Sequence, residues 1–214
     1  MWYLAVLGFV CSYLLGNLNG AVIVSSIYAH DDVRTHGSGN AGLTNFHRVF
    51  GGPLTAVVIL CDVLKAVVAV LVGAWIAGSF APALWGGDLA LIGKYWGALF
   101  CLLGHMFPCM FHFRGGKGIL SGGTIALMVD WRIALVVWGG FLLLTALTRY
   151  VSLGSVWAGG SFPFISWICY PDPIIIVLAF ACGGLVVWKH RANIKRLLSG
   201  TEKKATFSKF KKQK

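Results

Sequence analysis

The stretch VVILCDVLKAVVAV, Val57 to Val70, indicates how this chain folds. It is apolar except for Asp62 and Lys65, and it lies inside a longer apolar segment, 53–78. A transmembrane helix needs about 20 mostly apolar residues. Charged side chains inside such a helix usually face the protein interior and pair with one another. We therefore expect a membrane span in which Asp62 and Lys65, three residues apart, form an ion pair.

The whole chain has the composition of a membrane protein. Of its 214 residues, 57% are hydrophobic and only 12% are charged, and the mean hydropathy is +0.78. Soluble domains carry about 25% charged residues. Nine Trp and 28 Gly residues also fit, because Trp is enriched at membrane interfaces and Gly lets membrane helices approach closely. The composition predicts an all-α integral membrane protein.

The basic residues indicate how often the chain crosses the membrane. Apolar segments occupy 2–27, 53–78, 89–112, 118–129, 132–148, 151–169 and 173–188. Lys and Arg follow the first, third, fifth and seventh of them, at Arg34 and Arg48, Arg114 and Lys117, Arg149, and the C-terminal region. Because Lys and Arg concentrate in cytoplasmic connections, we predict about seven transmembrane helices, with the N-terminus outside and the C-terminus in the cytoplasm.

A basic C-terminal region accounts for most of the net charge of +11. From Lys189 onward the chain has ten Lys and Arg residues and one acid, Glu202, whereas the preceding part has eight bases and six acids. Such a region suits the anionic surface of a membrane better than nucleic acid. We predict one membrane domain, 1–202, followed by a basic cytoplasmic tail, 203–214, and no nucleic-acid partner.

The glycine-rich stretch GSGNAGLTN, Gly37 to Asn45, follows the first apolar segment. It matches the dinucleotide-binding pattern G-x-G-x-x-G, but that pattern requires a preceding strand in a soluble βαβ unit, and here a span precedes it. Glycines in such a loop also allow several backbone N–H groups to converge on phosphate oxygens. We therefore predict a phosphate site to which these residues contribute: Ser38, Gly39, Asn40, Gly42, Thr44, Asn45 and Arg48.

Two further polar segments lie in predicted cytoplasmic regions. In RGGKGILSGG, Arg114 to Gly123, Lys117 lies between glycines before a short predicted helix. The segment is not a Walker A loop, because Gly118 replaces the required Ser or Thr. A Lys at this position can still bind a phosphate group. In KHRANIKRLLSGTE, Lys189 to Glu202, His190 and Asn193 share one face of a predicted helix. Histidine can act as a general base or orient a hydroxyl group.

Other histidines and the cysteines carry less information. His105, in LLGHMFP, either packs in the core or lines the site, and the sequence leaves both open. The six cysteines include no C-x-x-C pair, and the remaining histidines have no ligand spacing. We expect neither a metal nor a cofactor.

Three segments, in this order, resemble the three motifs of the bacterial acyl-phosphate:glycerol-3-phosphate acyltransferase family. They are GSGNAGLTN with the following Arg48, GGKG around Lys117, and HRANIKRLLSGTE from His190. The chain length and the pattern of spans are also similar to that family. The resemblance extends to about Glu202. Local departures are Ala66, where the family tends to have Gly, and the ILSGG that follows GGKG.

The resemblance implies an enzyme of the bacterial cytoplasmic (inner) membrane with its active site facing the cytoplasm. It would transfer a fatty acyl group from acyl phosphate to the 1-hydroxyl of glycerol 3-phosphate, giving lysophosphatidic acid and phosphate. The residues that match the family's catalytic and binding positions are Ser38, Arg48, Lys117, His190 and Asn193. Arg48, Lys117 and the amides around Gly39–Gly42 would hold phosphate groups, while His190 and Asn193 would orient glycerol 3-phosphate. Whether His190 or the departing phosphate accepts the hydroxyl proton stays open.

Two other classes of protein share part of this pattern. A transporter for a phosphorylated solute also has glycine-interrupted spans, but it needs polar groups near the midplane and usually has paired halves. A basic-tailed membrane anchor for a partner protein would leave the two glycine loops unexplained. The crowding of polar motifs on one predicted face, without an internal repeat, favours the enzyme.

Overall fold

The structure is a computed structural model that describes residues 2–80 and 88–205. Within these ranges the chain forms helices and connecting loops, with no strand. The helices are α1 (Trp2–Asn17), α2 (Gly20–Tyr28), η1 (Val33–Thr35), α3 (Leu43–Val49), α4 (Leu54–Phe80), α5 (Leu89–Met106), η2 (Cys109–Phe111), α6 (Ile119–Val129), α7 (Trp131–Thr148), α8 (Val151–Cys169), α9 (Pro173–Lys189) and α10 (Arg191–Leu198). The predicted all-α fold class is confirmed. Most of the predicted tail, residues 206–214, lies outside the described residues.

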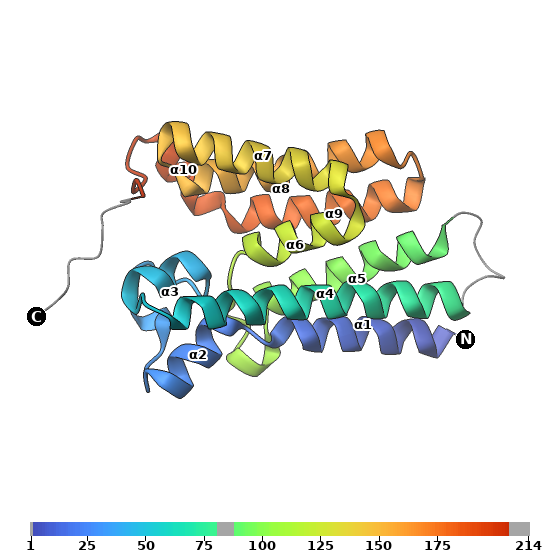
Figure 1. Cartoon of the computed structure of the whole chain (residues 1–214), viewed down its shortest axis with the longest axis horizontal. Coiled ribbons are helices and arrows are strands. Elements are labelled where there is room, and N and C mark those ends of the chain that lie inside the picture. Colours follow the sequence, from blue (N-terminus) through green and yellow to red (C-terminus); the bar gives the residue numbers. More distant parts are fainter. Residues whose placement is uncertain (1, 81–87, 206–214) are drawn as a thin grey trace, which may run out of the picture.

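The long helices form two layers joined by a short one (Figure 1). In one layer α1, α4 and α5 pack against each other, and in the other α8 lies between α7 and α9. The short helix α6 contacts α4, α5, α7 and α8, and α5 also reaches α9. The main core lies where these helices meet, around Tyr95, Met106, Ile125 and Ala179. The layers therefore form one bundle.

Glycines allow the helix axes to approach closely within each layer. A Cβ at Gly73 of α4 would collide with the backbone of Gly93 and Gly97 of α5. A Cβ at Gly183 of α9 would collide with the backbone carbonyl of Gly159 of α8. Such small-residue contacts are typical of helices packed in a membrane, where close van der Waals contact replaces the hydrophobic driving force.

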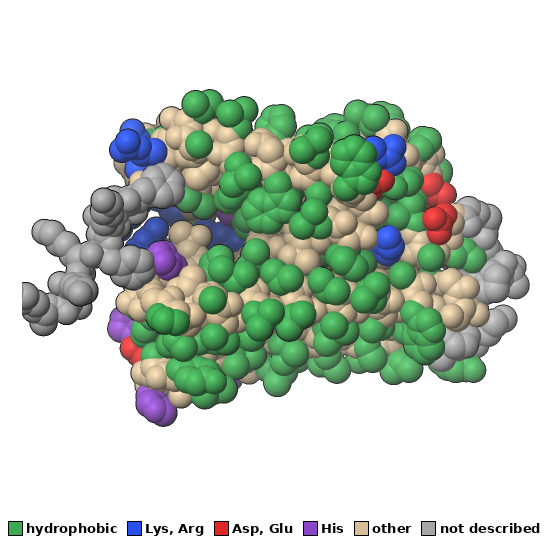
Figure 2. All heavy atoms as spheres, in the orientation of Figure 1, with side chains coloured by type: hydrophobic (Ala, Val, Ile, Leu, Met, Phe, Trp, Pro, Cys, Tyr) green, Lys and Arg blue, Asp and Glu red, His purple; other side chains and the backbone are tan. Residues whose placement is uncertain are grey.

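The outer surface of the bundle matches the predicted membrane environment. Exposed apolar side chains cover α4, α7, α8 and α9, including Leu64, Leu142, Trp167 and Val177, and green side chains dominate the middle of the face in Figure 2. Among the described residues, three helices are long and apolar enough to span a membrane, or five segments if each bent helix pair is one span. The helix α6 has 11 residues, which is short for a hydrocarbon layer of about 30 Å. The count of seven spans and its orientation stay predictions.

The first predicted span is broken into two helices. The axes of α1 and α2 differ by 46°, and the break lies at Leu18 and Asn19. Asn19 is fully buried, and its side-chain oxygen accepts a hydrogen bond from Val22 N at 3.1 Å, which caps α2. Lys65 Nζ donates to the Leu18 carbonyl at 3.0 Å and so satisfies a group that the break leaves free. The break turns α2 toward the polar loops.

Candidate active site

The polar segments gather at one end of the bundle. Figure 1 places α2, α3 and α10 at this end, opposite the N-terminus. Figure 2 shows Lys, Arg and His side chains around a hollow between the two layers here. The predicted convergence of the cytoplasmic motifs on one end therefore appears in the fold.

The first glycine loop has a backbone shape that requires glycine. Gly37 and Gly39 have φ angles of +62° and +69°, a conformation that other residues adopt at a cost. Gly39 N donates to His36 O at 3.0 Å, which closes a turn, and Gly42 is the N-cap residue of α3 without a side-chain cap. Ser38 and Gly39 are exposed, and Asn40 is half-buried. The loop is thus fixed in shape and open to solvent at Ser38 and Gly39.

Asn45 supports this loop from the inside. The side chain is 2% exposed, and its Oδ1 accepts from Ser38 N at 2.8 Å. Its Nδ2 donates to Val33 O at 3.0 Å and to His36 O at 3.1 Å. Both N–H donors are therefore used within the protein. We reassign Asn45 from a ligand of phosphate to the residue that holds the loop in shape.

The second glycine loop lies directly against the first. Gly116 N donates to His105 O at 3.1 Å, and a Cβ on Gly116 would approach Ala41 O to 2.5 Å. Arg34 adds a second connection, because its Nη1 donates to Phe111 O at 2.9 Å while its guanidinium pairs with Asp32. The first and second motifs are thus joined.

Lys117 connects the second loop to the third segment. Its Nζ donates to Asn193 Oδ1 at 2.5 Å, and Asn193 Nδ2 donates to Glu202 Oε1 at 2.7 Å. Glu202 also pairs with Arg196 at 2.6 Å. Asn193 is therefore held from both sides, and its oxygen fixes the position of the Lys117 ammonium. Glu202 supports the site, a role that the sequence pattern did not indicate.

The sequence predicts that His190 and Asn193 share one face of a single helix. In the structure His190 instead lies at a bend, before the helix that contains Asn193. The axes of α9 and α10 differ by 57°, and His190 stands between them. Its side chain is 3% exposed, and its Nδ1 lies 2.8 Å from the carbonyl of Val186. A carbonyl only accepts, so Nδ1 carries a proton, and in the neutral ring Nε2 is the free acceptor.

Burial lowers the pKa values of Lys117 and His190, which lie outside the long helices. Burial, followed by the charge of Arg196, lowers the pKa of Lys117 to about 8. Burial also lowers the pKa of His190 to about 4, against a smaller opposing effect of its hydrogen bond to Val186. At neutral pH the site therefore contains a cationic Lys117 beside a neutral His190.

The remaining predicted ligands lie on the first loop and on α3. Thr44 and Arg48 are exposed on α3, and within the described residues the Arg48 side chain has no ion pair or hydrogen bond in the protein. Their predicted roles stay predictions. Asn19, which sequence analysis missed, donates to Ala41 O at 3.0 Å and ties the helix break to the first loop. The polar N-L-N at 17–19, inside an apolar segment, was the available indication.

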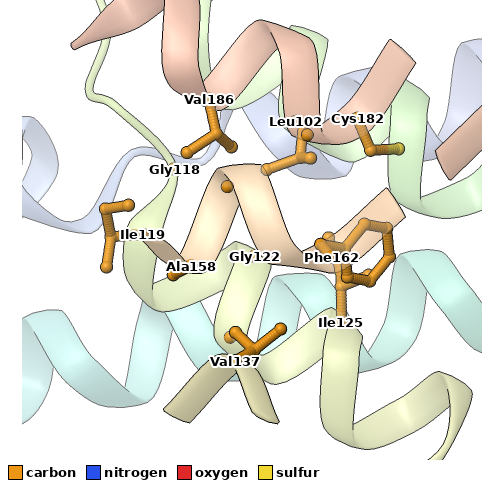
Figure 3. Close-up of a pocket in the computed structure, with 13 residues that line it drawn as sticks. Leu102, Gly118, Ile119, Gly122, Ile125, Val137, Ala158, Phe162, Cys182 and Val186 are labelled. Carbon is orange, nitrogen blue, oxygen red and sulfur yellow. The ribbon is translucent and has the colours of Figure 1, made fainter. Parts of the chain in front are cut away.

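An apolar cavity begins beside the polar groups. It is lined from α5 to α9 by residues such as Leu102, Val137 and Phe162 (Figure 3). Gly118, which follows Lys117, lines it, as does Val186, whose carbonyl holds His190. Polar groups that suit phosphate therefore adjoin a cavity that suits an alkyl chain.

Comparisons with known proteins agree with this combination. The sequence model of the family described as glycerol-3-phosphate acyltransferase matches residues 6–200. The glycerol-3-phosphate acyltransferase of Clostridioides difficile (strain 630) is 43% identical over 195 residues, which cover 91% of this chain and 92% of that protein. The protein of the same name from Thermoanaerobacter sp. (strain X514) is 36% identical, with 94% and 95% covered.

Solved structures give the same result. The crystal structure of PlsY (YgiH), an integral membrane glycerol 3-phosphate acyltransferase, in its glycerol 3-phosphate form matches with a TM-score of 0.81 and 28% identity. The match covers 94% of this chain and 96% of that one. The lysophosphatidic acid form matches with a TM-score of 0.78 and 27% identity, covering 94% and 95%. The chain is therefore a membrane protein that belongs to the glycerol-3-phosphate acyltransferase family.

Proposed function

We propose that this protein transfers a fatty acyl group from acyl phosphate to the 1-hydroxyl of glycerol 3-phosphate, giving lysophosphatidic acid and phosphate. The enzyme acts in the bacterial cytoplasmic (inner) membrane, and its active site faces the cytoplasm. The observation that carries the proposal is the position of Lys117. Its ammonium lies on a glycine loop, is fixed by Asn193, and adjoins both neutral His190 and the apolar cavity.

The site suits two substrates that both carry phosphate. Lys117 and Arg48 supply positive charge for phosphate oxygens, and the amides of residues 40–42 supply N–H groups. The predicted contribution of the Gly39 amide is corrected, because this N–H already donates to His36 O. The cavity beside Gly118 is lined by apolar side chains and takes part of an acyl chain. The membrane supplies the acyl donor and receives lysophosphatidic acid, so membrane lipids surround the acyl chains of both molecules.

The reaction needs one bond formed and one broken. The 1-hydroxyl oxygen of glycerol 3-phosphate attacks the acyl carbonyl carbon, and the bond from that carbon to the phosphate oxygen breaks. Lys117 and the loop amides offset negative charge on the carbonyl oxygen and on the departing phosphate, as preorganised donors do in acyl transfer. The products are the ester and phosphate that carries the hydroxyl proton.

The proton passes to the departing phosphate and not to His190. Burial lowers the pKa of His190 and so weakens it as a base. The departing phosphate gains an anionic oxygen as the bond to the acyl carbon breaks, and this oxygen accepts the proton. The free Nε2 of His190 accepts a hydrogen bond from the hydroxyl and orients it, and Asn193 assists. A His190→Ala variant then weakens glycerol 3-phosphate binding more than it slows turnover at saturation.

Ser38 takes part as a hydrogen-bond donor and not as a nucleophile. The acyl phosphate is already activated, so an acyl-Ser38 intermediate would add a step without lowering the barrier. Ser38 is exposed on the first loop, and its backbone N–H donates to Asn45. Mass spectrometry of the protein trapped with acyl phosphate alone should therefore find no acyl group on Ser38.

One assay tests the proposed reaction. Purified protein is incubated with acyl phosphate and labelled glycerol 3-phosphate, and lysophosphatidic acid is measured by chromatography, with acyl-CoA as donor in parallel. We expect product from acyl phosphate only. Lys117→Met should abolish most activity, while Lys195→Met, which removes an exposed positive charge on α10, should not. Product from acyl-CoA at an equal or higher rate would overturn the proposed donor, and uptake of glycerol 3-phosphate into vesicles without acyl transfer would favour a transporter.

A further inference from the structure

A cluster of buried charged and polar side chains lies beneath the two glycine loops and has no part in the mechanism above. Lys65 Nζ is 2.6 Å from Asp62 Oδ1 and 2.7 Å from His105 Nδ1, and all three side chains are at most 3% exposed. The predicted ion pair between Asp62 and Lys65 is thus confirmed. Asp62 Oδ1 also accepts from Gly20 N at 3.3 Å, at the start of α2.

The contacts of Lys65 determine which nitrogen of His105 carries the proton. The three N–H groups of the ammonium have three acceptors at hydrogen-bond distance: Asp62 Oδ1, Leu18 O at 3.0 Å, and His105 Nδ1. An ammonium can only donate, so His105 Nδ1 must accept. The proton of the neutral imidazole is therefore on Nε2. Asp62 and Lys65 fix this tautomer, as a partner on one ring nitrogen commonly does.

His105 Nε2–H points to the junction of the two loops. A Cβ on Gly116 would collide with Nε2 and with Ala41 O, so the ring edge lies against the point where the loops touch. Within the described residues, no hydrogen bond joins Nε2 to another protein group, and Nε2 is not among the fully enclosed polar atoms that lack a partner. Its N–H is therefore available to a ligand at the junction.

We propose that His105 Nε2–H donates a hydrogen bond to an oxygen of a substrate phosphate held between the two glycine loops. Asp62 and Lys65 are the positioning residues that keep the proton on Nε2. The inference rests on the proposed function, because it takes the bound phosphate to be that of glycerol 3-phosphate or of acyl phosphate. A neutral donor fits this place, since Lys117 and Arg48 already supply cations and a third charge would cost burial energy.

Two substitutions at His105 separate this role from simple packing. In His105→Gln the side-chain nitrogen occupies the place of Nε2, so a donor toward the junction is kept while the acceptor for Lys65 is lost. In His105→Asn the side-chain oxygen can take the place of Nδ1, so the acceptor for Lys65 is kept and the donor toward the junction is lost. Thermal unfolding in detergent measures the folding of both variants.

The readout is the Michaelis constant for each substrate in turn. Loss of a hydrogen bond to a charged phosphate weakens binding by about 10-fold to 100-fold. We expect His105→Asn to raise KM by this factor for one substrate and His105→Gln to raise it less, because the donor toward the junction is kept. A rise confined to glycerol 3-phosphate identifies its phosphate as the ligand, and a rise confined to acyl phosphate identifies the donor's. Normal KM values for both substrates in His105→Asn, or a larger rise in His105→Gln, would overturn the inference.

A second measurement does not depend on variants at His105. In a protein whose four exposed histidines (His30, His36, His47 and His112) are replaced by Gln, ¹⁵N spectra report only His105 and His190. These two should show opposite tautomers, protonated on Nε2 and on Nδ1 respectively. The Nε2–H resonance of His105 should shift when glycerol 3-phosphate or an unreactive acyl phosphonate is added. A proton on Nδ1, or no shift with either ligand, would overturn the inference. Absence of acyl transfer by the wild type would instead contradict the proposed function.

Discussion

The contact between the two glycine loops can be tested by adding one methyl group at Gly116. The φ angle of Gly116 is not positive, so alanine would not strain the backbone and would act only through its size. The new Cβ would lie 2.5 Å from Ala41 O and would also collide with His105 Nε2. Both neighbours are buried, and each is held by other contacts, Ala41 O by Asn19 and His105 by Lys65.

The size of the effect follows from this geometry. Ordinary contact needs about 3.5 Å, so the loops must separate by about 1 Å. A displacement of about 1 Å in a site that positions reacting groups can cost about 100-fold in rate. Overpacking a buried position costs about 1–3 kcal/mol of folding stability. We expect Gly116→Ala to fold with lowered thermal stability and to lose about 100-fold in kcat/KM.

The assay is acyl transfer to labelled glycerol 3-phosphate, with thermal unfolding measured on the same preparation. Gly184→Ala is the matched control, because Gly184 lies on the exposed face of α9 with nothing within 4 Å of a new Cβ. Alanine there should keep activity and stabilise the helix by about 0.5–1 kcal/mol. Activity of Gly116→Ala within about 3-fold of the wild type would refute the reasoning, because a 1 Å separation of the loops would then not matter.

Three other predictions concern the charge of Lys117, the support of the first loop, and the hold on Asn193. Phosphate binds the protonated form of Lys117, whose pKa is about 8. The affinity for substrate is therefore full below that pH and falls about tenfold per pH unit above it. Lys117→Arg should flatten this pH dependence, and a steep rise in KM for that variant between pH 8 and 9 would contradict the role of Lys117. Asn45→Ala removes three hydrogen bonds that hold the first loop and should cost about 1–3 kcal/mol in thermal unfolding, whereas exposed Thr44→Ala should stay within about 0.5 kcal/mol. Equal effects would contradict the reassignment of Asn45. Asn193→Asp places a carboxylate against Glu202 and should lower thermal stability, and adding Glu202→Gln should restore it; no recovery in the double variant would exclude repulsion as the cause.

The long helices were predictable from the sequence, whereas the breaks in them were not. The apolar segments 132–148 and 151–169 agree with α7 and α8 to within one residue, because the ends of apolar runs mark where a chain leaves the membrane. The break at Leu18 and the bend at His190 depend on tertiary partners. Lys65 satisfies the Leu18 carbonyl from 47 positions away, and no local pattern shows such a contact.

The candidate site was predictable as a set of residues but not in its internal arrangement. Composition and spacing indicated glycine loops, Lys117 and His190, because few structural roles need such residues together. The side-chain amide of Asn45 can bond a phosphate or a backbone carbonyl equally well. Only the fold shows that it donates to the backbone carbonyls of residues 33 and 36. His105 likewise had two open readings until the contacts of Lys65 and Gly116 placed it beneath the loops.

The central claim is that the three polar segments form one site for substrate phosphate. An experimental structure of the protein with glycerol 3-phosphate and an unreactive acyl phosphonate tests it most directly. We predict a phosphate or phosphonate group between the glycine loops, within hydrogen-bond distance of Lys117 Nζ, with the glycerol hydroxyl at His190 and alkyl carbons in the cavity behind Gly118. Phosphate bound at the opposite end of the bundle, or the two ligands bound at separate places with Lys117 contacting neither, would contradict the account.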